Sequence, residues 1–283
     1  MNLKRFRGFT GLTFVVALCV CVAACGPRTN QHPAAPPPKI PWTGMLSDIR
    51  AVWGAEPGID LLTAPAVVVR AYLESIFVAS NGGDIGYAYP GFTRAVAPNA
   101  PEGRPDSARD RWPDTGHPLR DRLVGTDRYH ILHIDATGPQ VTAVVCYWAY
   151  TSALDLGNGN YGWKMALPAT DPGAGIAVHW IAMTAPRDAP TPPLPSQKGT
   201  AAAPVDDVFG TWRITGHNMA ADTVPQQDSD PAGWPSEVAD ARSCVDTAPD
   251  PLERRLFLRN GVHPRSDFPT LPPYPGWPPA GAE

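Results

Sequence analysis

The histidines of this sequence are the side chains best suited to proton transfer or metal binding near neutral pH. His130 and His133 fall in one strand-like run. Because side chains alternate along a regular strand, we expect these two on opposite faces of a sheet, unable to share a metal ion. His179 and His217 fall in two later strand-like runs and could point into a shared concavity as an acid–base pair. A histidine satisfied in the core or at the surface explains each of them better, so no metal site is predicted.

Motifs that identify common enzymes are absent from the sequence. It contains no G-x-S-x-G, S-x-x-K or H-E-x-x-H, no glycine-rich phosphate loop, and no C-x-x-C after residue 25. Charged residues make up only 18% of the chain and form no basic patch, which argues against a nucleic-acid-binding surface. We therefore expect no cofactor and no nucleic-acid partner, and a non-catalytic role is favoured.

The first 25 residues have the pattern of an export signal. Residues 1–7 carry three basic side chains and no acid, and residues 8–24 are apolar and uncharged, as in a secretory signal peptide. Val22-Ala23-Ala24-Cys25 resembles the lipobox of bacterial lipoproteins. That resemblance implies cleavage before Cys25 and a diacylglyceryl group on its sulfur. An ordinary secretion signal and an uncleaved anchor helix are the alternatives.

A lipid on Cys25 would decide where the protein resides. Each buried CH₂ group of its two acyl chains contributes about 0.8 kcal/mol to membrane binding. We therefore expect a protein held at the extracytoplasmic face of the cell membrane, with the membrane as its first partner. Loss of the basic signal peptide leaves an acidic chain, which an anionic membrane surface would not attract.

The distribution of proline predicts the domain organisation. After the signal peptide (1–24), residues 25–44 form a proline-rich tether, a composition typical of semi-rigid spacers. Residues 45–222 carry the apolar patterns of a folded domain. Residues 223–283 are expected to form an irregular extension, extended and poorly ordered from residue 264 onward, where seven prolines occur.

One strong helix is predicted near the start of the folded domain. Thr63-Ala64-Pro65 provides the capping hydroxyl and the first-turn proline of a helix start. The helix should run to about Ser80, with Arg70 and Glu74 on the side opposite its core face. Weaker helices are expected over 45–53 and 91–97.

Strands follow the helices along the chain. Five runs are rich in β-branched and aromatic residues: 128–136, 141–154, 163–167, 175–185 and 211–219. This order predicts an α+β fold in which N-terminal helices pack on one strongly curved antiparallel sheet of about five strands.

The order of elements resembles the NTF2-like (cystatin-like, SnoaL-like) superfamily. The segments AVVVRAYLESIFVAS, YHILHIDATGPQVTAVVCYWAY and WRITGHN carry the resemblance, and similar segments behind similar lipoboxes occur in mycobacterial lipoproteins. The resemblance implies a roll with a pocket between helix and sheet, where enzymes of the superfamily use an Asp or a His–Asp pair for proton transfer beside a carbonyl. The candidate pocket residues are Tyr72, Asp84, Trp148, His179 and His217.

Two cysteines remain if Cys25 carries a lipid, namely Cys146 and Cys244. An exported compartment permits disulfides, and two cysteines allow only one pairing. We therefore expect a Cys146–Cys244 disulfide, with two buried or free thiols as the alternative.

Three functions follow from these patterns. The favoured one is an exported, lipid-anchored envelope protein that binds a partner protein or an apolar ligand without catalysis. The second is an isomerase- or cyclase-like enzyme that uses the pocket of the roll. The third is a cell-wall carbohydrate binder, which needs two exposed coplanar tryptophan rings, whereas the nine tryptophans are scattered and core packing explains most of them.

Overall fold

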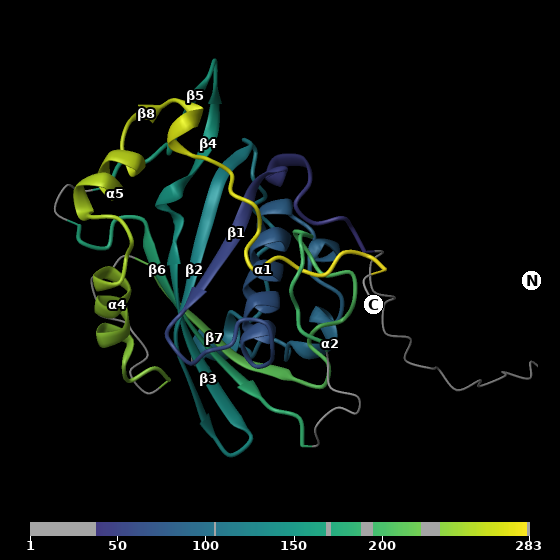
Figure 1. Cartoon of the computed structure of the whole chain (residues 1–283). Coiled ribbons are helices and arrows are strands. Elements are labelled where there is room, and N and C mark those ends of the chain that lie inside the picture. The colour runs from purple at the N-terminus through teal and green to yellow at the C-terminus, as the bar shows by residue number, and fades with distance from the viewer. Residues whose placement is uncertain (1–37, 105, 168–170, 188–194, 222–232, 282–283) are drawn as a thin grey trace, which may run out of the picture. The chain divides into compact units, whose positions relative to one another are not determined.

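A mixed β-sheet is the central element of the structure (Figure 1). The computed structural model describes residues 38–104, 106–167, 171–187, 195–221 and 233–281. The predicted signal peptide, Cys25 and most of the predicted 25–44 tether therefore lie outside the described residues. None of the helices in the described ranges has the length and apolar character needed to cross a membrane.

Eight strands form the sheet within the described ranges, in the order β7-β6-β3-β2-β4-β5-β8, with β1 paired to β2 outside this path. The β1–β2 pairing is parallel, and the other pairings between strands are antiparallel. The strands are β1 Asp48–Ala55, β2 Leu123–Thr137, β3 Gln140–Trp148, β4 Ser152–Gly157, β5 Asn160–Gly162, β6 Ile176–Thr184, β7 Arg213–Ala221 and β8 Val262–His263.

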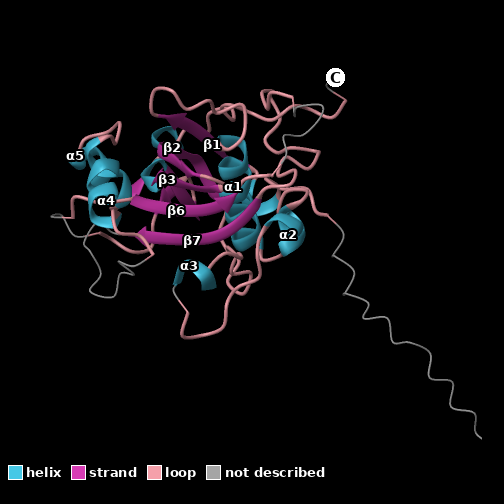
Figure 2. Ribbon diagram, turned by 90° about the horizontal axis from the view of Figure 1, so that it is seen from below, coloured by secondary structure: helices cyan, strands magenta, loops and turns pink. Residues whose placement is uncertain are grey.

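Helices cover both sides of this sheet. The α-helices in the described part of the chain are α1 Ala66–Gly82, α2 Phe92–Ala95, α3 Asp106–Arg109, α4 Glu237–Asp246 and α5 Leu252–Arg259. The 3₁₀ turns are η1 Gly44–Leu46, η2 Ile85–Tyr87, η3 Ala149–Thr151 and η4 Arg265–Asp267. Figures 1 and 2 show α1 on one side of the sheet and α4 and α5 on the other, and each side has its own cluster of buried apolar residues.

The predicted roll of N-terminal helices on about five antiparallel strands is wrong. The sheet has eight strands and is not closed, and α1 is the one long helix that precedes its main strands in the described chain. Residues 45–53, expected as a weak helix, mostly form β1, in which buried Ile49, Ala51 and Trp53 alternate with more exposed neighbours. This strand pairs with β2 from Asp48↔Val124 to Ala55↔Ile131, a long-range contact that local periodicity does not predict.

Two predicted strands also differ. Residues 141–154 form two strands, because η3 separates β3 from β4, and residues 163–167 follow the short strand β5 instead of forming one themselves.

No side chain caps the start of α1, because the Thr63 hydroxyl donates instead to Asp60 Oδ2 at 2.9 Å, but the helix forms close to the residues predicted for it. It ends at Gly83, whose φ of 69° lies in the left-handed region that glycine adopts without steric cost. The expectation that Arg70 and Glu74 lie away from the core is wrong, because their exposed fractions are 0% and 2%. The C-terminal residues cover that side of the helix, with Trp277 in contact with both side chains.

The C-terminal segment is packed, contrary to the expectation of a poorly ordered tail. Trp53 N donates to Tyr274 O across 2.6 Å, and Trp277 is 1% exposed. Trp277 and Ala201 also exchange backbone hydrogen bonds of 2.8 and 2.9 Å. Proline lacks an N–H but keeps its carbonyl and ring, so a proline-rich segment can still pack along a sheet edge. The predicted irregular extension further contains α4, α5 and β8.

Candidate functional site

The structure brings together three of the predicted pocket residues on the α1 side of the sheet. His179 on β6 and His217 on β7 approach with Nδ1 and Nε2 at 3.1 Å. The Tyr72 ring, on α1, meets His217 edge-on with ring centroids 5.4 Å apart. All three side chains are buried, so this is a packed polar cluster between helix and sheet.

The cluster is satisfied by internal hydrogen bonds. Tyr72 Oη donates to the Arg111 carbonyl at 2.9 Å, and His217 Nδ1 lies 2.9 Å from the Asp110 carbonyl. Three of the four ring nitrogens of the histidine pair therefore contact protein atoms. Burial lowers the pKa of His179 and of His217, because a charged imidazolium loses hydration. Both rings are neutral near pH 7, and their geometry favours packing over proton transfer.

Asp84 and Trp148 do not join this cluster. The Asp84 carboxylate caps η2 by accepting from Gly86 N at 2.7 Å and forms an ion pair of 2.8 Å with Lys39 near the surface. Trp148 lies on the opposite face of the sheet, where its Nε1 donates to the Cys244 carbonyl at 3.1 Å. The five candidates therefore do not line one pocket.

A buried aspartate that the sequence did not single out lies on the α1 side of the sheet. Asp127 is 0% exposed, and Tyr147 Oη donates to its Oδ2 at 2.8 Å. Burial raises the pKa of Asp127 to about 7. Tyr147 stacks on Tyr129, which stacks on Trp53, with ring centroids 4.8 and 4.5 Å apart. No local pattern distinguishes Asp127 from the exposed aspartates, since its burial arises from neighbours on three strands.

A second buried carboxylate joins α1 to both ends of the described chain. Glu74 accepts hydrogen bonds from Trp53 Nε1 at 2.7 Å, Tyr89 Oη at 2.6 Å and Trp277 Nε1 at 2.9 Å. Burial raises the pKa of Glu74. Arg70, one turn earlier, packs its guanidinium over the Trp277 ring at 4.2 Å. We call Glu74 and its three donors the Glu74 cluster, and its saturated contacts indicate a structural role.

The expectation that His130 and His133 lie on opposite faces is wrong. The β2–β3 register shifts between Ile131 and His133, so Leu132 is an extra residue that resets the alternation. The partners of His130 and His133 on β3 are Cys146 and Val144, which both belong to the core on the α4 side. A bulge has no reliable signature in a single sequence.

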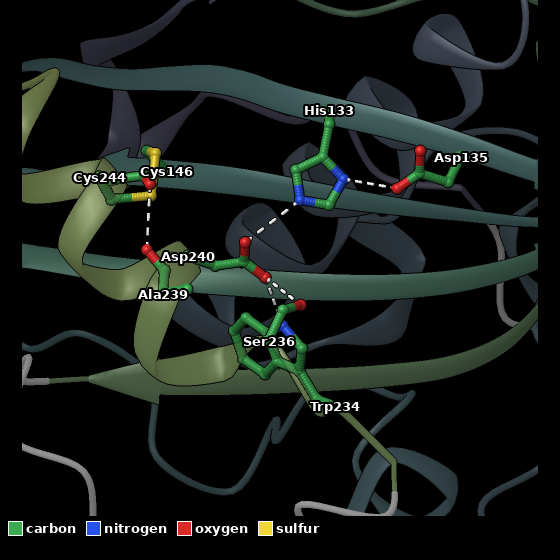
Figure 3. Close-up of polar contacts among 9 residues, drawn as sticks. His133, Asp135, Cys146, Trp234, Ser236, Ala239, Asp240 and Cys244 are labelled. Carbon is green, nitrogen blue, oxygen red and sulfur yellow. Dashed lines mark hydrogen bonds and ion pairs between the residues drawn. A yellow bond between two sulfur atoms is a disulfide. The ribbon is translucent and has the colours of Figure 1, made fainter.

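His133 links the sheet to α4 (Figure 3). Its Nδ1 lies 2.9 Å from Asp135 Oδ2 and its Nε2 lies 3.2 Å from Asp240 Oδ1. Asp240 also accepts from Trp234 Nε1 at 2.7 Å and from Ser236 Oγ at 2.8 Å. His130 contacts a different carboxylate, and within the described ranges no three His, Cys, Asp or Glu side chains are placed to hold a metal ion.

A disulfide joins the same helix to the sheet. The structure bonds Cys146 of β3 to Cys244 of α4 with an S–S distance of 1.99 Å (Figure 3), the pair that the sequence left available. The two cysteines are 98 residues apart, so the bond constrains a long stretch of the unfolded chain.

Two of the pockets in the described part of the chain have linings suited to a ligand. One, of about 240 Å³, lies beside η1, and Trp42, Met45 and Leu119 belong to its mainly apolar lining. The other, of about 220 Å³, lies beneath α5, and its lining includes Arg128 and Asp250. The histidine cluster lines neither of these two pockets.

Comparison with known proteins identified no relative. Protein-family models, curated proteins and solved structures all gave no match to the chain.

Proposed function

We propose that this chain is an exported, lipid-anchored envelope protein whose folded part has a binding role without catalysis. The observation that carries the proposal is the sequence Val22-Ala23-Ala24-Cys25 after a basic and then apolar segment. The Cys146–Cys244 disulfide supports it, because such bonds persist in oxidising, extracytoplasmic compartments.

Binding is favoured over catalysis by the state of the acid–base groups. On the α1 side, His179, His217 and Asp127 are buried and bonded to other protein groups, whereas a general base must reach the proton it removes. The two described pockets offer space for a ligand away from these groups.

The lipid anchor is tested by mass spectrometry of the mature N-terminus from membrane fractions. We expect a first residue of Cys25 that carries a diacylglyceryl mass. Cys25→Ala should lose the lipid and leave the membrane fraction or accumulate as precursor, whereas the matched control Cys21→Ala should behave as wild type. An unmodified wild-type product that begins at Met1, unchanged by Cys25→Ala, would reject the proposal.

A further inference from the structure

The pocket beneath α5 is built from four parts of the chain. Thr126 and Arg128 are two residues apart on β2, so their side chains point to the same face of the sheet. Turn η3 supplies Thr151, α5 and the residues just before it supply residues 250–258 of the lining, and residues 266–271 complete it. The volume of about 220 Å³ suits one small molecule, since pockets for drug-sized ligands start at about 300 Å³.

Arg128 is the cation of this pocket that has no partner of its own. Its Nε is buried without a hydrogen bond, and its guanidinium forms no hydrogen bond or ion pair with any residue in the described ranges. Arg70, Arg111 and Arg255 share the buried Nε, but their terminal nitrogens donate to backbone carbonyls. An unpaired, partly buried guanidinium is costly, and a carboxylate would satisfy it through two parallel N–H···O bonds.

Two aspartates limit the charge that the pocket accepts. Asp267 Oδ1 lies 3.6 Å from Arg254 Nη2, so these two charges offset each other. Asp250 also lines the pocket, close to the Tyr150 hydroxyl. Two arginines and two aspartates leave the lining formally neutral. With Asp267 offset by Arg254, Asp250 repels a doubly charged anion about twice as strongly as a single carboxylate, which Arg128 alone can balance.

The rest of the lining matches a hydroxylated ring. Asp250 is an acceptor for hydroxyl groups, and the Ser266 hydroxyl, which has no hydrogen bond to another described residue, can donate or accept. Leu258, Pro269 and Leu271 add an apolar wall, against which the C–H face of a sugar ring can pack. A few polar groups on an apolar wall are typical of small-molecule sites.

We propose that this pocket binds a small carboxylic acid that also carries hydroxyl groups, the chemistry of a hexuronic acid. Arg128 holds the carboxylate, Asp250 and Ser266 bond to hydroxyls, and the ring rests on Leu258 and Leu271. The inference rests on the proposed binding role and gives that role a ligand class. It does not depend on the lipid. A negative result in the N-terminal mass measurement would reject the lipid anchor alone, and a negative result in the binding experiment would reject the ligand alone.

The test is titration calorimetry on the detergent-solubilised mature chain with glucuronate, glucose and inorganic phosphate. Glucuronate should bind saturably, and glucose, which lacks the carboxylate, should bind about tenfold or more weakly, the typical effect of losing a charge-assisted hydrogen bond. Phosphate should bind more weakly than glucuronate. Arg128→Gln should weaken glucuronate binding by a similar factor. Arg128→Lys keeps the positive charge but lacks the paired N–H donors of the guanidinium, and it should weaken binding by less.

The matched control is Arg122→Gln, because Arg122 is exposed and pairs with Asp48 at 2.9 Å outside the pocket. Ser266→Ala is a second, milder variant that guards against a folding defect in Arg128→Gln, and it should weaken glucuronate binding severalfold at unchanged melting temperature. No saturable glucuronate binding, equal binding by Arg128→Gln, or tighter binding of phosphate or glucose would overturn the proposal.

Discussion

The two faces of the sheet are stabilised in different ways. On the α1 face, the buried carboxylates Glu74 and Asp127 lie among aromatic rings and accept hydrogen bonds from them, although Asp127 Oδ1 has no hydrogen bond. On the α4 face, a disulfide and the His133–Asp240 contact attach short helices to the strands, and a pocket remains beneath α5 with Arg128 unpaired.

This difference suggests different roles for the two faces, one in the stability of the fold and the other in ligand binding. A face covered by a long helix and the C-terminal segment buries its polar groups, and each such group must then find a partner inside the protein. A face covered by short helices needs a covalent bond to hold them, but it leaves room where the helices do not meet. We therefore expect substitutions of the buried polar groups on the α1 face to affect folding, and those beneath α5 to affect binding. The apolar pocket beside η1, which α1 also lines, is an exception on the α1 face.

The largest effect is expected from loss of the disulfide. Replacement of Cys146 and Cys244 by alanine should lower the free energy of unfolding by about 4–5 kcal/mol, the chain-entropy value for a loop of about 100 residues. Urea unfolding of the variant, compared with wild type with and without reductant, measures this. Unchanged stability would show that the α4 face is held by packing alone.

The next effect concerns Asp127 and depends on pH. A carboxyl whose pKa rises from 3.8 to about 7 on folding keeps its proton in the folded state while the unfolded state ionises. This group therefore makes stability fall between about pH 4 and pH 7, by at most about 4 kcal/mol.

Asp127→Asn removes that dependence. The stability of the variant minus that of wild type should rise between about pH 4 and pH 7 and stay constant above, as measured by urea unfolding across this range. The control Asp48→Asn changes an exposed aspartate on β1 that pairs with Arg122, and it should not reproduce the change that Asp127→Asn causes between about pH 4 and pH 7. Parallel curves for Asp127→Asn and wild type would contradict the idea that burial governs Asp127.

A smaller effect is expected at the Glu74 cluster. Glu74→Ala leaves Trp53 and Trp277 without an acceptor, whereas Tyr89 Oη keeps the Ala202 carbonyl at 3.2 Å. At about 1 kcal/mol for each buried donor, the free energy of unfolding should fall by about 2 kcal/mol. Tryptophan fluorescence during urea unfolding measures this loss. Glu253→Ala on α5 is the matched control, and an equal effect from both would remove the contrast between the two faces.

Part of the fold and of the sites is predictable from short stretches of sequence. Pro65 and Gly83 delimit α1, because the fixed φ of proline at a helix start and the left-handed backbone of glycine at its end are properties of single residues. The turn at residues 138–139 between β2 and β3 is equally local. The approach of His179 to His217 was predictable, because both histidines lie in recognisable strands. The burial of the two rings was not.

The failures share one physical cause. Arg70 and Glu74 look like a surface pair in sequence, but Trp277, some 203 residues from Glu74, covers them. The bulge at Leu132, the parallel pairing of β1 and the unpaired state of Arg128 likewise depend on partners distant in the chain.

Short stretches of sequence are thus enough to predict the main helix and most strands, and they carry the pattern on which the proposed export rests, because each depends on residue types within a few positions. Which polar side chains are buried, which face each histidine occupies and where a pocket remains follow only from the packing of the whole chain. Burial and pairing are set by the free energy of the whole packed chain, in which distant segments exclude water from one another.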